Sequence, residues 1–442
     1  MRLHLMSLIL KKIDRRYEGS YSTRSNSQDY RHWVNAYLDK NLSDKFSMLM
    51  DVNAYVGRRE TAQSDRITTD NGVSPISSIH TMDYDLVDGK FNLDFRSGKW
   101  SASAGVEYSY TSTRQVQRSE NSPADNRSEN NQYHNLYALY ATAMYTLSSH
   151  WTVNAGIRGE LSSNHYSYDG ESQPESGSDF YLTPNLGINY YGGGVYASLT
   201  YSSNLYRPVY YFLTTGFSSL SPTLWQTGNP FLKEDHENQF QFSLSWKKSY
   251  FYILYGLGKN RCDYGLWYDP EMEVSIMNPV SVPKMQNVAI VLQQRMNIGI
   301  WNPTLTGILL MQHLRFGDLN EKFENPYLRL QWQNYFSLPW RLQAYANLYY
   351  STNGHTNLYL VSQTFNADII LSRTFGPVSV DIYANNILNT SKLAYTLSMN
   401  GVKYVTDRKA CGPSFQLSVT YNFKASKANY KGGHKSSDLN RL

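Results

Sequence analysis

Residues 228–246 read GNPFLKEDHENQFQFSLSW, and the second half of this stretch decides the fold. Apolar and polar residues alternate strictly there, with Phe240, Phe242, Leu244 and Trp246 on one side and Gln241, Ser243 and Ser245 on the other. Such alternation predicts a β-strand with one apolar face. That face must meet either the core of a soluble sheet or the lipid of a membrane.

The composition favours the membrane. Charged residues make up 17% of the 442 residues, which is below the roughly 25% of a typical soluble domain. Aromatic residues reach 14%, with 38 Tyr and 9 Trp, although the mean hydropathy is only −0.51. These values suit a barrel wall with one apolar and one polar face and with aromatic residues at both membrane interfaces. The net charge of +5 is small for a nucleic-acid-binding protein.

Alternating segments recur along the chain, and no apolar run approaches the length of a membrane-spanning helix. A strand of about ten residues crosses a bilayer when it is tilted by about 45°. The clearest segments are 101–110, 152–160, 195–202, 341–350 and 415–423. Short connections occupy 42–45, 147–150, 191–194, 337–340 and 375–378, whereas long polar connections are expected over 57–78, 112–131, 161–179, 204–236 and 388–410. An outer-membrane barrel alternates short turns and long loops in this way.

Tryptophans mark one end of the expected strands. Trp100, Trp151, Trp301 and Trp340 each follow a short turn, and Trp prefers a membrane interface because its ring is apolar and its N–H is hydrated. The combined patterns predict an all-β fold, a transmembrane antiparallel β-barrel with roughly 16–18 strands in this chain. These strands would be part of a larger barrel if the whole reaches the roughly 22 strands of an outer-membrane transporter.

The segment 203–246 carries the strongest family signal. One expected strand ends with Tyr206, Arg207 and Pro208, and a long loop follows it. The next strand is opened by Gly228, Asn229, Pro230, Leu232, Lys233 and Glu234. In this arrangement the chain resembles the TonB-dependent outer-membrane receptors and transporters, in particular the outer membrane protein beta-barrel group common in Bacteroidota. The expected hairpin at 27–48 and the basic tail after the last strand resemble the same group.

The resemblance implies a receptor in the Gram-negative outer membrane that binds an external ligand with its outer loops and takes it up. In the family, a TonB-type energy-coupling protein acts on a plug domain inside the barrel, but neither the plug nor its TonB-binding motif is found in this sequence. The N-terminal stretch MRLHLMSLILKK is also a poor signal peptide. We therefore expect the barrel portion of a longer protein, with an atypical N-terminus and a partial first strand and turn over 1–26, the barrel over 27–423 and a basic polar tail over 424–442.

Two other functions remain open. One is a plugless passive channel or structural barrel of the outer membrane, and the other is a secreted all-β binding protein. An enzyme is not expected, because the loop histidines lie in no nucleophile elbow or metal-spaced cluster; these are His80, His150, His165, His236 and His355. The expected partners are outer-membrane lipid, an external ligand of unknown identity and, through a plug, the TonB-type protein, with no nucleic acid and no cofactor.

Ligand-binding residues are expected on the long loops, where receptors carry their recognition surface. The candidates are Tyr206, Arg207, Tyr210, Tyr211 and Trp225. No metal site is expected, because the acidic loop 168–179 lacks the spacing of a calcium-binding loop and is interpreted as a solvated surface. The sequence leaves open whether Cys262 and Cys411 form a disulfide.

Five charged residues fall on the polar phase of their expected strands. They are Glu107, Arg158, Glu160, Arg329 and Arg341. We expect them to face the lumen, because an Arg or Lys on the lipid face costs roughly 2–4 kcal/mol at the bilayer midplane. They could line a solute path, contact a plug or pair with one another, and pairing is the role that we favour.

Overall fold

The structure is a computed structural model that describes residues 19–69, 72–120, 127–169, 171–172, 177–221, 223–318, 320–409, 412–423 and 441. These residues form strands and two short 3-10 helices, η1 (Tyr210–Leu213) and η2 (Pro339–Arg341). Within the described ranges, no helix is long and apolar enough to cross a membrane.

One large antiparallel sheet forms the wall of the molecule. Two of its 19 strands, β7 (Glu171–Ser172) and β18 (Glu321–Lys322), contain only two residues each. The other 17 strands pair as a meander in chain order. They are β1 (Gly19–Asn41), β2 (Phe46–Thr69), β3 (Gly72–Ser97), β4 (Trp100–Glu120), β5 (Arg127–Thr146), β6 (Trp151–Tyr168), β8 (Gly177–Gly192), β9 (Val195–Tyr206), β12 (Asp235–Trp246), β13 (Ser249–Lys259), β16 (Met285–Arg295), β17 (Trp301–Phe316), β19 (Tyr327–Leu338), β20 (Leu342–Ser351), β23 (Thr364–Phe375), β24 (Val378–Asn385) and β27 (Ser414–Tyr421).

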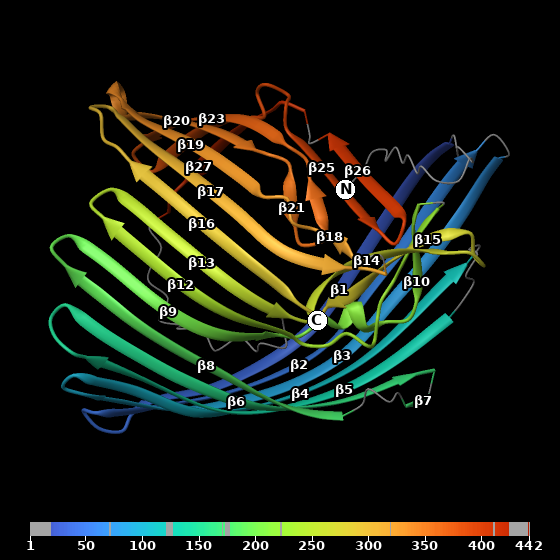
Figure 1. Cartoon of the computed structure of the whole chain (residues 1–442), viewed down its shortest axis with the longest axis horizontal. Coiled ribbons are helices and arrows are strands. Elements are labelled where there is room, and N and C mark those ends of the chain that lie inside the picture. The colour runs from blue at the N-terminus through green and yellow to red at the C-terminus, as the bar shows by residue number, and fades with distance from the viewer. Residues whose placement is uncertain are drawn as a thin grey trace.

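This architecture confirms the all-β prediction and the expected number of strands. Figure 1 shows the wall curving around an interior. Among the described residues, β1 pairs only with β2 and β27 pairs only with β24, so this part of the wall has two edges. β1 runs without interruption through the expected boundary between residues 26 and 27. The expected tail 424–442 lies outside the described residues except for Arg441.

The apolar face of the alternating strands points outward, away from the interior. In β12 the ladder places Leu244 opposite Ala197 and Phe251, on the same face as the exposed side chains of Phe240 and Trp246. Exposed large apolar side chains recur on the outer face of the other wall strands. An outward apolar belt of this kind is the lipid-facing surface of a membrane barrel.

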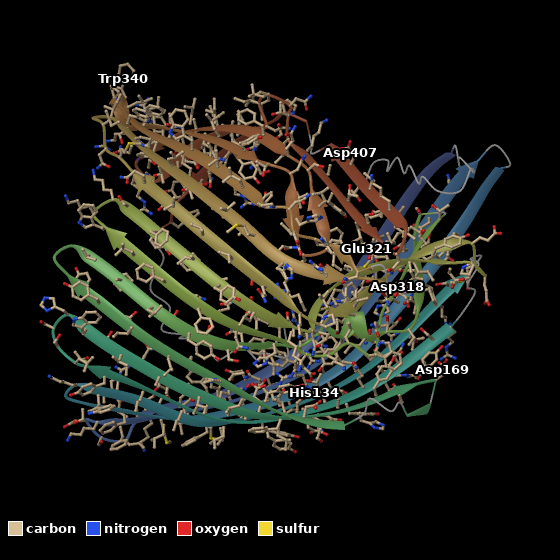
Figure 2. The ribbon with its side chains drawn as sticks, viewed as in Figure 1. His134, Asp169, Asp318, Glu321, Trp340 and Asp407 are labelled. Atoms are coloured by element: carbon tan, nitrogen blue, oxygen red, sulfur yellow. The ribbon has the colours of Figure 1, made fainter. Side chains whose placement is uncertain are left out.

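Short turns join the strands at one end of the wall. The turns expected at 42–45, 147–150 and 191–194 lie between successive wall strands as predicted. Trp100, Trp151 and Trp340 are exposed at this end, and Figure 2 shows Trp340 there. Trp301 is only partly buried, and its Nε1 donates a hydrogen bond to Asn334 Oδ1 at 2.9 Å. We call the end of the wall that carries these turns the short-turn end.

The opposite end differs from the prediction, because three of the expected long loops are largely strand. β2 to β5 are 20 to 26 residues long and include most of 57–78 and 112–131, and β6 and β8 include most of 161–179. Both faces of these extensions carry polar side chains, so they lack the apolar alternation that identifies a strand. Their backbone groups still pair with the neighbouring strand, as strand backbone requires. The wall therefore extends beyond the apolar belt on this side, and we call these extensions of β2 to β6 and β8 the raised wall.

The remaining long connections fold into a structure that we call the cap. One four-stranded sheet contains β10 (Phe217–Ser221), β11 (Leu224–Thr227), β14 (Arg261–Asp269) and β15 (Val274–Val282). A second contains β21 (Gly354–Thr356), β22 (Tyr359–Val361), β25 (Lys392–Met399) and β26 (Val402–Lys409). Figure 1 shows these strands gathered at the end opposite the short turns.

The cap has a hydrophobic core of its own. Buried residues from both small sheets and from β17 form one cluster, whose most buried members include Leu224, Leu266, Leu314, Leu358 and Leu397. The sequence interpretation of 204–236 and 388–410 as plain loops is therefore wrong. Their cap strands are four to eight residues long, and β11 pairs with β15 and β25 with β22 across distant segments, so neither segment shows a long alternating pattern.

Candidate functional site: the luminal loop and its wall

The segment that follows β9, residues 207–221 and 223–228, lies against the inner face of the raised wall, and we call it the luminal loop; its second half contributes β10 and β11 to the cap. Its backbone carbonyls accept hydrogen bonds from side chains of β4. Gln115 Nε2 donates to Tyr210 O at 2.9 Å, and Gln117 Nε2 donates to Phe217 O at 2.6 Å. Ser119 Oγ also donates to Phe217 O, at 2.8 Å. The loop is thus attached to the wall along its length.

The sequence of β4 explains this attachment. Every second residue of its raised part is a buried polar residue, namely Ser109, Thr111, Thr113, Gln115, Gln117 and Ser119. Buried polar groups need hydrogen-bond partners, and the loop carbonyls supply them for Gln115, Gln117 and Ser119. The inward row therefore forms a surface that fits an irregular backbone rather than a hydrophobic core.

Apolar contacts fix the loop at two points. Tyr210, which is 1% exposed, and Leu213 pack against Met82 and Tyr84 of β3. Farther along, Trp225 is buried with Ile76 and with residues of β15. These clusters join the wall, the luminal loop and the cap.

An ion-pair network anchors the start of the loop. Arg158 of β6 bonds Glu107 of β4 through Nη1 at 3.0 Å and Glu160 through Nε at 2.5 Å. Arg207, the first residue of the loop, donates from Nη2 to the other carboxylate oxygen of Glu160. The side chains of Glu160 and Arg207 are each 9% exposed. The geometry confirms the expected pairing among Glu107, Arg158 and Glu160 and adds Arg207.

The other two charged residues have different surroundings. Arg329 lies over the rings of Tyr349 and Tyr327, with its Cζ 5.2 and 5.9 Å from their centroids. A guanidinium over an aromatic face gains cation–π stabilisation. Arg341 lies in η2 at the short-turn end with φ 56°, so its assignment to a strand is wrong. The preceding Pro339 favours a turn at this position.

Arg441 extends the site. Its Nε donates to Pro208 O and its Nη1 contacts His134 Nδ1, both at 3.1 Å, and its Cζ lies 4.2 Å from the centroid of Tyr210. A guanidinium only donates, so His134 Nδ1 accepts and the ring proton is on Nε2, which lies 2.9 Å from Ser162 Oγ. Figure 2 shows His134 away from both ends of the wall. Nothing in the sequence indicated this contact.

The five candidate ligand residues lie on or directly before the luminal loop, but their surroundings differ. Tyr206 and Tyr211 are 48% and 44% exposed. Tyr210 and Trp225 are buried in the clusters described above, and Arg207 is held by Glu160. Only the first two therefore present a large free surface to a ligand.

Tyr211 belongs to a row of aromatic rings that runs from the wall to the cap. The centroid of its ring lies 5.4 Å from that of His80 of β3 and 6.3 Å from that of Phe212. The ring centroids of Phe212 and Tyr264 of β14 are 5.4 Å apart. Burial lowers the pKa of His80, which keeps its ring neutral at pH 7. Burial also raises the pKa of Tyr264 to about 12. The row is therefore uncharged and suited to stacking.

The turn GNPFLKE fastens the luminal loop to the cap. Asn229 Nδ2 donates to Pro279 O at 2.9 Å, and the backbone N–H of Lys233 donates to Ser281 Oγ at 3.0 Å. Both acceptors lie on β15. A Cβ at Gly228 would lie 2.3 Å from the carbonyl oxygen of Thr214, so only glycine fits where the two backbones approach.

The cap contains one buried carboxylate that joins two of its segments. Asp263 accepts the backbone N–H of Tyr264 at 2.8 Å and that of Leu358 at 3.0 Å. Burial raises the pKa of Asp263 to about 6. Beside it, Arg261 pairs with Asp235 at 3.1 Å and Glu237 at 3.6 Å, which joins β14 to the start of β12.

The described ranges contain part of the acidic loop and one of the two cysteines. Within these ranges, no group of three or more His, Cys, Asp or Glu side chains is arranged to hold a metal ion. In the acidic loop, Asp169 accepts the backbone N–H of Glu129 at 3.0 Å; residues 170 and 173–176 lie outside the described residues. Cys262 has a free thiol, and Cys411 lies outside the described residues.

A family model described as outer membrane protein beta-barrel family matches residues 38–421. The chain belongs to this family. Its members are outer-membrane proteins, so the outward apolar belt faces the lipid of the outer membrane. No curated protein matches the sequence.

Solved structures share the fold at low sequence identity. The siderophore receptor PiuA from Acinetobacter baumannii has a TM-score of 0.60 and 13% identity over 90% of this chain and 65% of PiuA. The copper transporter OprC has a TM-score of 0.58 and 10% identity over 92% of this chain and 76% of OprC. The ferric-catecholate import receptor Fiu from E. coli K12 has a TM-score of 0.57 and 11% identity over 92% of this chain and 64% of Fiu. The chain thus spans slightly less than two thirds of PiuA and of Fiu, and its fold is similar to the barrels of these receptors and of OprC.

Proposed function

We propose that the chain is the barrel of an outer-membrane receptor that binds an external ligand for uptake. The observation that carries this proposal is the uncharged aromatic row that runs from His80 to Tyr264 and includes the exposed Tyr211. Aromatic rings held on a rigid support provide a stacking surface for a planar ligand. The three named structures are receptors or transporters for siderophores or copper, which supports a ferric catecholate siderophore as the first ligand to test.

The proposal includes three further expectations. Energised uptake depends on a TonB-type protein acting through a plug domain, as the family resemblance implies. The barrel, whose first described strand begins at Gly19, extends to residue 423 and is followed by a basic tail over 424–442. The chain binds and transfers its ligand without catalysing a reaction, in agreement with the receptors and transporters that share its fold.

Ligand binding is tested by fluorescence. The full chain is folded in detergent micelles and titrated with a ferric catecholate siderophore while Tyr and Trp emission is recorded. Tyr211→Ala should weaken saturable quenching at least tenfold, or about 1.4 kcal/mol, because the stacking surface is lost. The matched control is Tyr191→Ala, since Tyr191 is exposed at the short-turn end, far from the luminal loop. Equal binding by both variants and the wild type would contradict the assignment of the site.

Two measurements separate this proposal from the alternatives. A passive channel would give steady ion conductance in a planar bilayer, whereas a lumen covered by the loop and cap should give little. A secreted binding protein would remain soluble without detergent and would show no heat-dependent shift on a gel.

A further inference from the structure

The outer face of the wall contains a hollow of about 550 Å³ in its apolar belt. Two neighbouring rows of the ladder form it. One row crosses β2 to β8 through Val52, Gly89, Tyr108, Tyr137, Leu161 and Phe180. The adjacent row passes through Met50, Phe91, Val106, Leu139 and Gly159. The hollow lies where the two glycines interrupt these rows of large side chains.

The glycines are not required by the backbone. A Cβ at Gly89 would have only a Val52 methyl at 4.0 Å, and a Cβ at Gly159 would make ordinary contact with the ring of Phe180 at 3.4 Å. Gly105 on the next strand differs, because a Cβ there would lie 2.5 Å from the carbonyl oxygen of Phe91. The absence of side chains at Gly89 and Gly159 therefore shapes the outer surface without relieving a steric conflict.

The rim of the hollow is apolar and exposed. Leu139 and Phe180 are 66% and 69% exposed, and the rings of Tyr108 and Tyr137 lie 5.0 Å apart beside them. The Tyr108 hydroxyl donates to Asn135 Oδ1 at 3.2 Å. Two residues beyond Tyr110, the outward positions of β4 become polar at Ser112 and Arg114. The hollow thus lies just inside the cap-side boundary of the apolar belt.

The short turns of outer-membrane barrels face the periplasm, so the cap side faces outward. We infer that this hollow binds one acyl chain of an outer-leaflet lipid. In the outer membrane this face contacts lipid, and an empty hollow would deprive its lining of dispersion contacts. A flexible hydrocarbon chain fills a narrow concave surface without needing a polar partner. It also contacts a concave wall on more sides than a flat one, so this lipid should exchange more slowly than lipids elsewhere around the barrel.

The test fills the hollow with protein. Gly89→Leu and Gly159→Leu, singly and together, place side chains where the acyl chain would lie. The matched control is Gly307→Leu on β17, which faces lipid between Leu292 and Leu330 and where a Cβ would make only ordinary contact, with Leu330 Cδ2 at 3.6 Å. The full chain is extracted from outer membranes in mild detergent and washed. Native mass spectrometry then counts the lipids retained by each chain.

The wild type and Gly307→Leu should retain one lipid species through washing, and the double variant should lose most of it. A heat-dependent gel shift like that of the wild type shows that the double variant is folded. Equal lipid retention by the wild type and the folded double variant would overturn the inference. Loss of a dimer, rather than of lipid, would also overturn it, because the hollow would then be covered by a second copy of the chain.

Discussion

Replacing Arg207 tests the attachment of the luminal loop most sharply. Arg207→Ala removes one of two cationic partners from Glu160, whose side chain is 9% exposed. Removing the partner of a buried ion pair commonly costs about 3–5 kcal/mol. Arg158 Nε still bonds Glu160 at 2.5 Å in the variant. The free energy that holds the loop on the wall should therefore fall by about 2 kcal/mol, within the roughly 1.5–3 kcal/mol of one hydrogen bond to a charged group.

Hydrogen exchange can measure this loss locally. The Phe212 N–H donates to Val209 O at 3.0 Å, and the Asn229 N–H donates to Phe212 O at 2.6 Å, so both amides report on the loop. A loss of about 2 kcal/mol should speed their exchange about 30-fold. Amides in β20 provide an internal control far from the loop.

A double-mutant cycle identifies the cause. If Arg207 acts through Glu160, then Arg207→Ala should have a much smaller effect in a Glu160→Gln background. Arg207→Lys should retain part of the protection, because the charge remains but the guanidinium geometry does not. Unchanged exchange at Phe212 and Asn229 in Arg207→Ala would refute the reasoning, as would equal effects in the two backgrounds.

Two predictions concern the cap and its junction with the luminal loop. Because burial raises the pKa of Asp263 from 3.8 to about 6, the native cap binds this proton more tightly than the unfolded chain. Cap stability should therefore fall by about 3 kcal/mol as the pH rises from about 4 to above 6. Asp263→Asn should abolish this dependence of cap stability on pH, which is measured by the hydrogen-exchange rate of the Leu358 amide. A pH dependence that persists in the variant would contradict the assignment. Gly228→Ala should destabilise the junction by about 1–3 kcal/mol through its clash with Thr214 O, seen as faster exchange at Asn229, and unchanged exchange there would count against it.

The sequence predicted those parts of the fold in which a strand has one face in lipid. Phe240, Phe242, Leu244 and Trp246 alternate with polar residues because one face meets hydrocarbon and the other an aqueous or polar interior. The short turns and the tryptophans beside them were predictable for the same reason. The expected charge pairing of Arg158 with Glu107 and Glu160 followed from the strand phase and is found in the structure.

The raised wall and the cap could not be predicted from local pattern. From Gln115 to Ser119 the inward residues of β4 are polar, because their partners are backbone carbonyls of a loop about 100 residues away in sequence. Trp225 and Tyr210 looked like free loop aromatics, but distant segments bury them. The contact of Arg441 with His134 joins residues 307 positions apart, which no local signal indicates.

The central claim is that the outer face of the alternating strands meets lipid, and a pair of neighbouring substitutions tests it most directly. Leu244 faces outward between Ala197 and Phe251, whereas Ser243 faces inward between Ser198 and Tyr252. Leu244→Arg places a charge on the lipid face, where the cost reaches about 2–4 kcal/mol at the midplane and falls towards the interfaces, so it should reduce the heat-shifted, membrane-assembled fraction. Ser243→Arg should assemble like the wild type. Equal assembly of both variants in the outer-membrane fraction would contradict the lipid-facing assignment on which the account depends.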